Sequence, residues 1–167
     1  MPTTTHATTF LDRFRHWYDH ERDCNAKVIQ MLGSVPADRR SSEAFTRALG
    51  KATHLQAARH MWLYRLGVCA DSPESWFPSV TLEQLPGVTA KVERLWTDYL
   101  ASLTEADLLA DVTWLGKDDT RYRYPLIDLL TQVSGHAWYH RGQIATLVKD
   151  AGGEPINTYY IFWDRPT

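Results

Sequence analysis

The segment from Pro125 to Gly153 reads PLIDLLTQVSGHAWYHRGQIATLVKDAGG and predicts an amphipathic helix. Its apolar residues recur three or four positions apart, which places them on one face of a helix. A proline suits the first turn of a helix, and a glycine pair suits its end. The residues on the apolar face are Leu126, Leu129, Val133, Ala137, Ile144, Leu147 and Val148.

Two histidines lie on the same side of this helix. His136 and His140 are four residues apart, a spacing that brings side chains together on one helical face. His140 falls in the middle of the apolar stripe and His136 at its edge, so both should point into the protein. A buried imidazole pair needs a polar partner, and a divalent metal ion is the simplest one. The other interpretation is a pair of core histidines that bond to other polar groups.

Three further segments show helical spacing of apolar residues. They are residues 10–32, residues 41 or 42 to 67, and residues 88–103. The first carries Phe10, Phe14, Trp17, Cys24, Val28 and Leu32 on its stripe, the second Ala44, Ala48, Leu55, Trp62 and Leu66, and the third Val88, Val92, Leu95, Trp96, Tyr99, Leu100 and Leu103.

The connections suggest how these helices are arranged. The short link after residue 32 predicts an antiparallel pair, whereas residues 68–87 are long enough to cross the molecule and allow a parallel pair. Before the fourth helix, Val112, Trp114, Tyr122 and Tyr124 alternate with polar residues and predict a β-hairpin. We therefore expect an all-α fold in one domain, residues 1–167: a four-helix bundle with a long crossover and a small hairpin before the last helix.

Composition excludes several classes of protein. The chain has 167 residues, 44% of them hydrophobic, and a formal net charge of -2 without a basic stripe, which disfavours nucleic acid as a partner. No apolar run approaches the roughly 20 residues of a membrane span. The N-terminus does not resemble a secretory signal, so we expect a cytoplasmic protein. Cys24 and Cys69 form no CxxC motif and are expected to be unpaired core thiols.

The remaining histidines differ in direction. In the second helix, His54 lies at the border of the apolar stripe, so the helical wheel permits it as a third ligand without requiring it. His60 points nearly opposite to that stripe and is expected to be exposed. His16 and His20 also have helical spacing, but they lie on the polar side of the first helix or at its margin. We expect these two to be solvated.

Several motifs together resemble one family. The segment SGHAWYHRGQI (134–144), followed by GGEP (152–155), is similar to the signature of the DinB/YfiT-like proteins. The segment THLQAARHMWLYRL (53–66) resembles the histidine helix of that family, and Asn25 matches its first-helix asparagine. The hairpin and the Phe162-Trp163 tail fit as well. The resemblance covers nearly the whole chain, and HxxxHRGQ is its most specific part.

This resemblance implies an up-down-down-up four-helix bundle that is often a homodimer. It also implies one divalent metal ion, usually nickel or zinc, on His54, His136 and His140. One position departs from the family pattern, because Asp23 stands where an aromatic residue usually precedes the asparagine. That change alters the wall of the pocket and weakens any transfer of substrate from relatives.

Three neutral ligands leave the charge of a metal ion uncompensated and a coordination position open, the pattern of catalytic sites. Characterised relatives include transferases and isomerases that use bacillithiol or mycothiol, so the first hypothesis is an enzyme acting on a low-molecular-weight thiol. Metal-dependent hydrolysis is the second, and a non-catalytic, dimeric metal-binding stress-response protein is the alternative. An open site beside a substrate-sized cleft would favour the enzyme.

The sequence does not identify the residues that would complete such an enzyme. Glu21 either faces the site as a base or is a core-paired or partly exposed carboxylate, and Asp128 starts the fourth helix. The catalytic residues are therefore unknown at this level. Trp138, on the outer side of that helix, is either an anchor for a dimer, an ordinary surface aromatic residue, or one covered by the hairpin.

Overall fold

The structure, a computed structural model, describes residues 9–116 and 118–163. It contains α1 (Phe10–Gly33), α2 (Glu43–Arg65), α3 (Leu85–Ser102) and α4 (Leu126–Asp150), with β1 (Asp111–Leu115) and β2 (Arg121–Pro125) before α4. The strands form a two-stranded antiparallel hairpin in which Trp114 pairs with Tyr122. The predictions of four helices and of a hairpin before the last one are confirmed. His6 and the start of the chain lie outside the described residues.

The helix ends follow local chemistry. The Ser42 hydroxyl accepts a hydrogen bond from the Phe45 amide at 3.3 Å, a side-chain cap for α2. α3 begins at Leu85, three residues before the predicted start at Val88. Pro86 lies within its first turn, where a backbone N–H has no partner in the helix, so proline is tolerated there. None of the helices in the described ranges has the length and apolar character needed to cross a membrane.

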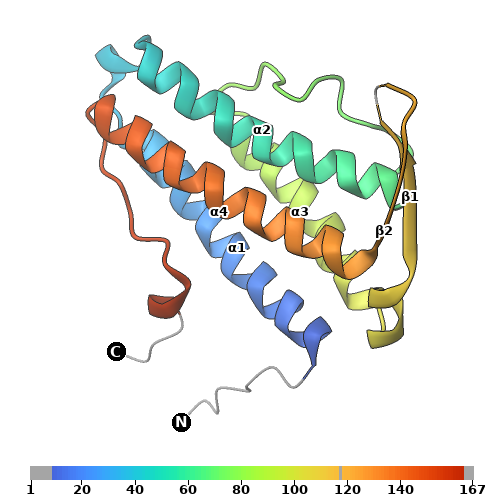
Figure 1. Ribbon diagram of the computed structural model, residues 1–167. Helices are drawn as coiled ribbons and strands as arrows, with labels where there is room; N and C mark the ends of the chain where they lie inside the picture. The colour runs from blue at the N-terminus through green and yellow to red at the C-terminus, as the bar shows by residue number, and fades with distance from the viewer. Residues whose placement is uncertain (1–8, 117, 164–167) are drawn as a thin grey trace.

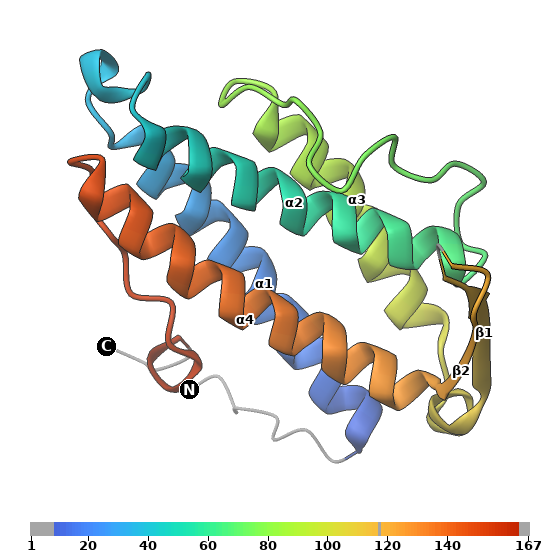
Figure 2. The same cartoon turned by 45° about the horizontal axis from the view of Figure 1, so that its top comes forward.

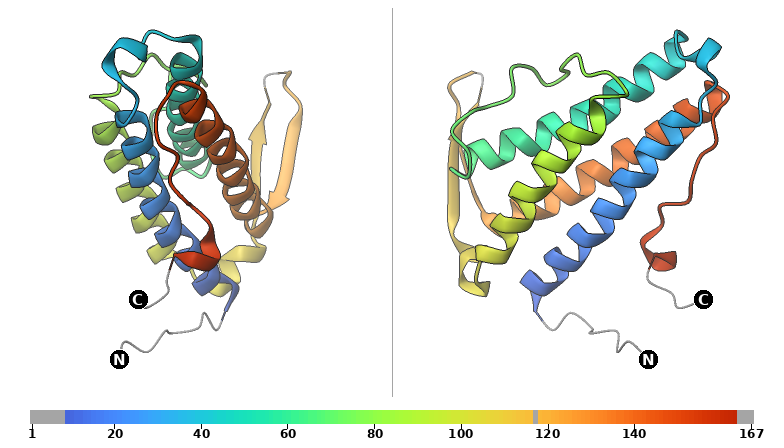
Figure 3. Two further views of the ribbon diagram at one scale, coloured as in Figure 1. Left: turned by 90° about the vertical axis from the view of Figure 1, so that its left-hand side faces the viewer. Right: turned by 180° about the vertical axis from the view of Figure 1, so that it is seen from behind.

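The four helices lie side by side (Figures 1 and 2). α1 and α4 run toward one end of the molecule, and α2 and α3 run back toward the hairpin. α2 packs against α4 and α3, and α1 packs against α3 and α4. Because α2 and α3 point the same way, the crossover of residues 66–84 returns along the length of the molecule (Figure 3).

The interior consists of two apolar clusters with a polar layer between them. The cluster away from the hairpin contains Val28, Met31, Leu32, Val35, Phe45, Ala48, Ala52, Leu55, Leu85, Ala137, Ile144, Val148 and Ala151. The cluster nearer the hairpin contains Leu11, Phe14, Tyr18, Leu63, Val92, Trp96, Leu100, Leu108, Leu126, Leu130 and Val133. Glu21 and Asn25 on α1 and Gln56 and Arg59 on α2 are buried at the level between the clusters.

Two expectations about the core are wrong. Phe10 was expected on the apolar stripe, but it is 66% exposed because Leu11 takes the inward position in the first turn. Cys24 is buried as expected, whereas Cys69 is only partly buried because it lies in the loop after α2. Both thiols are free, as expected.

Candidate metal centre

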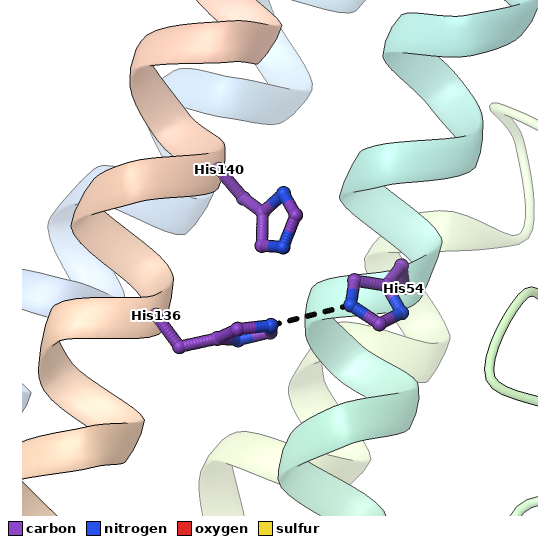
Figure 4. Close-up of side chains that lie close together, drawn as sticks. All are labelled: His54, His136 and His140. Atoms are coloured by element: carbon purple, nitrogen blue, oxygen red, sulfur yellow. Dashed lines mark hydrogen bonds between the residues drawn. The ribbon is translucent and has the colours of Figure 1, made fainter.

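Two neighbouring turns of α4 present His136 and His140 toward α2 (Figure 4). Their ring centroids are 4.5 Å apart. Ala137 and Ile144 on the same helix are fully buried, and they fix the rotation of α4 about its axis. Both histidines are therefore turned toward the space between α2 and α4, as the helical pattern predicts.

His54 projects from α2 into the same space. Its Nε2 atom lies 3.2 Å from Nε2 of His136, and its ring centroid lies 4.9 Å from that of His140. Each of the three side chains offers a ligand nitrogen, and these nitrogens all lie within 4.8 Å of one another. The structure thus brings together the three histidines that the sequence singled out, in a cluster that can hold a metal ion.

The spacing of these nitrogens fits a shared ion. Two imidazole nitrogens bound tetrahedrally at 2.0–2.1 Å to one ion are about 3.3 Å apart. The Nε2 atoms of His54 and His136 are already separated by 3.2 Å. Within the described residues, no cysteine, aspartate, glutamate or further histidine belongs to this cluster.

Two outer contacts set the tautomers of the ligands. His54 Nδ1 lies 2.8 Å from the backbone carbonyl oxygen of Trp76, which can only accept a hydrogen bond. His140 Nδ1 lies 2.9 Å from Oε1 of Gln143. Each Nδ1 therefore carries the proton and donates it, which leaves the Nε2 lone pair available to a metal ion. The ring of Phe77 also stacks on His54, with centroids 4.5 Å apart.

The electrostatic environment keeps His136 and His140 neutral. Burial, followed by the neighbouring His140, His54 and Arg59, lowers the pKa of His136 to about 4. Burial also lowers the pKa of His140, against an opposing effect of its bond to Gln143. These two imidazoles are therefore neutral near pH 7, the form that binds metal.

A cleft lies at the hairpin end of α2 and α4, and none of the three clustered histidines lines it. It has a volume of about 420 Å³ and opens between the hairpin, α2 and α4. Its walls are formed by Trp62, Trp114, Tyr122, Tyr124, Asp128, Leu129 and Gln132. Gln132 is one turn before His136 on α4, so the nearest wall of the cleft lies about one helical turn from that histidine. The volume of the cleft is within the range of small-molecule sites. Asp128, which the sequence singled out, is one of its lining residues.

Glu21 belongs to the buried polar layer. Its carboxylate lies 2.9 Å from Nη2 of Arg59, and it also accepts a hydrogen bond from Nη1 of Arg141. All three side chains are nearly inaccessible to solvent. Of the alternatives drawn from the sequence, the core-paired carboxylate is the one observed. Its oxygens are bound by two guanidinium groups, so it is not free to act as a base.

The other predicted histidine positions need correction. His20 is 2% exposed rather than solvated, because the segment after α4 folds beside α1 and places Tyr160 and Trp163 against its ring. His16 contacts the same two residues and is partly buried. His60 is not exposed either, since its side chain retains only 16% exposure beside Asp71. None of the three belongs to the cluster of His54, His136 and His140.

Sequence reasoning missed several residues that support the cluster. Gln143 carried a signal, because it stands three residues after His140 in the motif that resembles the DinB family. Trp76 contributes a backbone carbonyl, which has no signature in a sequence.

Trp138 is 46% exposed, as the helical wheel suggests. Its ring packs edge-on against that of Trp17, with centroids 5.6 Å apart.

The comparisons with known proteins identify the family. A family model described as the DinB family matches residues 1–167, the whole chain. No curated protein and no solved structure gives a significant match. Because the matching region includes all four helices, the hairpin and the three clustered histidines, the protein belongs to the DinB family.

Proposed function

We propose that this protein is a metal-dependent enzyme that acts on low-molecular-weight thiols, as an S-transferase or isomerase. One divalent ion, nickel or zinc, would be held by His54, His136 and His140. The observation that carries the proposal is a cluster of three imidazoles without an acidic partner among the described residues. A cleft of about 420 Å³, whose wall at Gln132 lies one helical turn from His136, offers space for a substrate. The cluster and the cleft are the two features that an enzyme of this type requires.

Charge explains the preference for a thiol substrate. The three ligands are neutral when deprotonated, so a divalent ion there would retain its charge and lower the pKa of a thiol or water molecule at its open position. A thiolate suits a borderline-soft ion such as zinc or nickel. Glu21 is ion-paired with Arg59 and Arg141, so its carboxylate is not free to act as a base.

The residues around the cluster have separate tasks in this proposal. Gln143 and the Trp76 carbonyl hold His140 and His54 in the tautomers that expose Nε2. The aromatic rings of Trp114 and Tyr122, stacked 5.4 Å apart, form an apolar wall for the second substrate or for the body of the thiol. Asp128 and Gln132 place hydrogen-bonding groups in the same wall.

We further infer the family's up-down-down-up bundle, a cytoplasmic location and a homodimer. The directions of the helices in Figure 1 support the first, and the two free cysteines agree with a reducing compartment. The exposed rings of Trp138 and Tyr139 on the outer face of α4 support the third, because aromatic residues are enriched in protein interfaces. Light scattering of Trp138→Ala beside wild type tests the dimer.

The first experiment measures metal. Purified protein is dialysed and its metal content determined for wild type, His140→Ala and His16→Ala. We expect His140→Ala to lose the ion of the three-histidine site and His16→Ala to retain it, because only His140 is part of the cluster. Equal metal content in the two variants would refute the ligand assignment.

The second experiment separates enzyme from scaffold. Cobalt-loaded protein is titrated with small thiols while the visible spectrum of the metal is followed, and a thiol-transfer screen is run in parallel. Thiol-dependent spectral change together with turnover would support the proposal. An unchanged spectrum and a fourth protein ligand would favour the non-catalytic protein, and turnover of esters or amides without any thiol would favour a hydrolase.

A further inference from the structure

The chain reverses direction where α2 ends. Gly67 adopts a φ of 73°, in the left-handed region that favours glycine, and the Val68 amide donates to the Leu63 carbonyl oxygen at 2.9 Å. This helix-terminating turn carries the following residues back along α2. As a result, Cys69 and Asp71 lie beside His60, one turn before the end of that helix.

These three side chains offer metal donors at one place. The ligand atoms of His60, Cys69 and Asp71 all lie within 4.8 Å of one another. His60 is six residues after His54, so it projects about 120° around the axis of α2 from it. The group therefore faces a different side of α2 from the three-histidine cluster, toward Lys91 on α3.

His60 has an unsatisfied nitrogen. Its Nε2 atom is buried and has no hydrogen-bond partner among the residues that the structure describes. The nearest carboxylate oxygen, Oδ2 of Asp71, is 3.5 Å away, which is longer than a normal hydrogen bond. A buried nitrogen without a partner costs free energy, and a cation between His60, Cys69 and Asp71 would bind its lone pair.

We propose that His60, Cys69 and Asp71 form a second metal site, for a divalent ion of the zinc class. One imidazole, one thiolate and one carboxylate are donors that zinc accepts, and water supplies the fourth position. The thiolate and carboxylate together carry two negative charges, which balance the ion, whereas the three-histidine cluster carries none. On binding, the Cys69 sulfur forms a bond to the metal and its thiol proton passes to solvent.

Lys91 is the competitor for this site. Its Nζ lies 3.8 Å from Oδ2 of Asp71, in an ion pair whose side chains are 60% and 67% exposed. Exposed pairs of this kind contribute little to stability, so Lys91 can move into solvent when a divalent ion arrives. The exposure of Asp71 also gives the ion a route of entry.

Cobalt distinguishes the two sites, because only this one contains a thiolate. Chelator-treated full-length protein is titrated with Co²⁺ without oxygen. We expect a thiolate-to-cobalt charge-transfer band in the near ultraviolet, lost in Cys69→Ser and retained in His140→Ala and Cys24→Ser. A band that persists in Cys69→Ser, or that never forms in wild type, would overturn the proposal.

Zinc stoichiometry gives an independent result. Two equivalents are expected for wild type, and one each for Cys69→Ser, Asp71→Asn and His140→Ala. One equivalent in wild type, still present in Cys69→Ser, would disprove this site and leave the three-histidine site intact. Cys69 and Asp71 lie in the partly exposed loop after α2, so both variants should fold, which circular dichroism checks. The titration of cobalt-loaded protein with small thiols is best done in Cys69→Ser. In that variant, a thiolate-to-cobalt band cannot come from Cys69 and reports only on added thiol at the three-histidine site.

Discussion

The carboxylate of Glu21 on α1 accepts a hydrogen bond from Arg141, the residue that directly follows His140 on α4. Arg59 on α2 contacts the other oxygen of the same carboxylate at 2.9 Å. A single acidic group thus ties together three helices at the level of the histidine cluster. Two buried guanidinium groups depend on it for charge compensation.

Replacing Glu21 with glutamine should destabilise the protein strongly. The change leaves Arg59 and Arg141 without their anionic partner, and removal of one member of a buried ion pair costs about 3–5 kcal/mol. Urea unfolding of the chelator-treated protein measures this loss. Glu43→Gln is the control, because it breaks only the exposed pair with Arg47, worth roughly 0.3–0.5 kcal/mol. Similar losses in the two variants would show that the buried layer is not held by charge.

Gln143 should control metal affinity through His140. Gln143→Leu removes the acceptor for His140 Nδ1, and loss of such an outer contact typically weakens metal binding about 10–100-fold. Gln143→Glu keeps an acceptor oxygen and should bind at least as tightly as wild type. Zinc affinity is measured by competition with a chromophoric chelator. Equal affinities in the leucine and glutamate variants would contradict this role.

The metal-free protein should lose stability as the pH falls from about 6.5 toward 4. The pKa of His136 is lowered from 6.5 to about 4 in the folded state, chiefly by burial. Between these values the unfolded chain binds more protons, so protonation favours unfolding and stability rises with pH. Urea midpoints measured across this range for wild type and His136→Asn provide the check. The variant should show a shallower slope, and parallel slopes would argue against the shifted pKa.

The aromatic wall of the cleft should affect substrate binding without affecting the metal. Tyr122→Ala removes the ring that stacks on Trp114, a contact worth roughly 0.5–1.5 kcal/mol beyond its buried area. For a substrate found in the thiol-transfer screen, we expect KM to rise up to about tenfold. Metal content should stay at the wild-type value. Tyr159→Ala, which changes an exposed ring outside the cleft, should leave KM unaltered.

The sequence predicted the helices and the His136–His140 pair because both depend on local periodicity. The stripe of α4 is set by its own apolar residues, so the inward direction of His140 follows without knowledge of its neighbours. His54 was different, because its position at the border of a stripe becomes meaningful only when α4 is placed opposite it. The family resemblance supplied that information.

The polar layer and the covered face of α1 could not be predicted in this way. Arg59 and Arg141 are charged residues that are rarely buried without a partner, and their partner Glu21 is 120 positions from Arg141. His20 was assigned to solvent because nothing nearby in sequence covers it. Tyr160 and Trp163 cover it, and they come from the other end of the chain.

The hydrogen bond from His54 to the Trp76 carbonyl has a consequence for how this protein can diverge. The acceptor is a main-chain oxygen, so no exchange of the side chain at position 76 deletes it. Point substitutions in the crossover can accumulate while the imidazole stays oriented, provided that the path of the loop is kept. Insertions or deletions between α2 and residue 76 would displace the carbonyl. The crossover should therefore tolerate changes of amino acid but not changes of length.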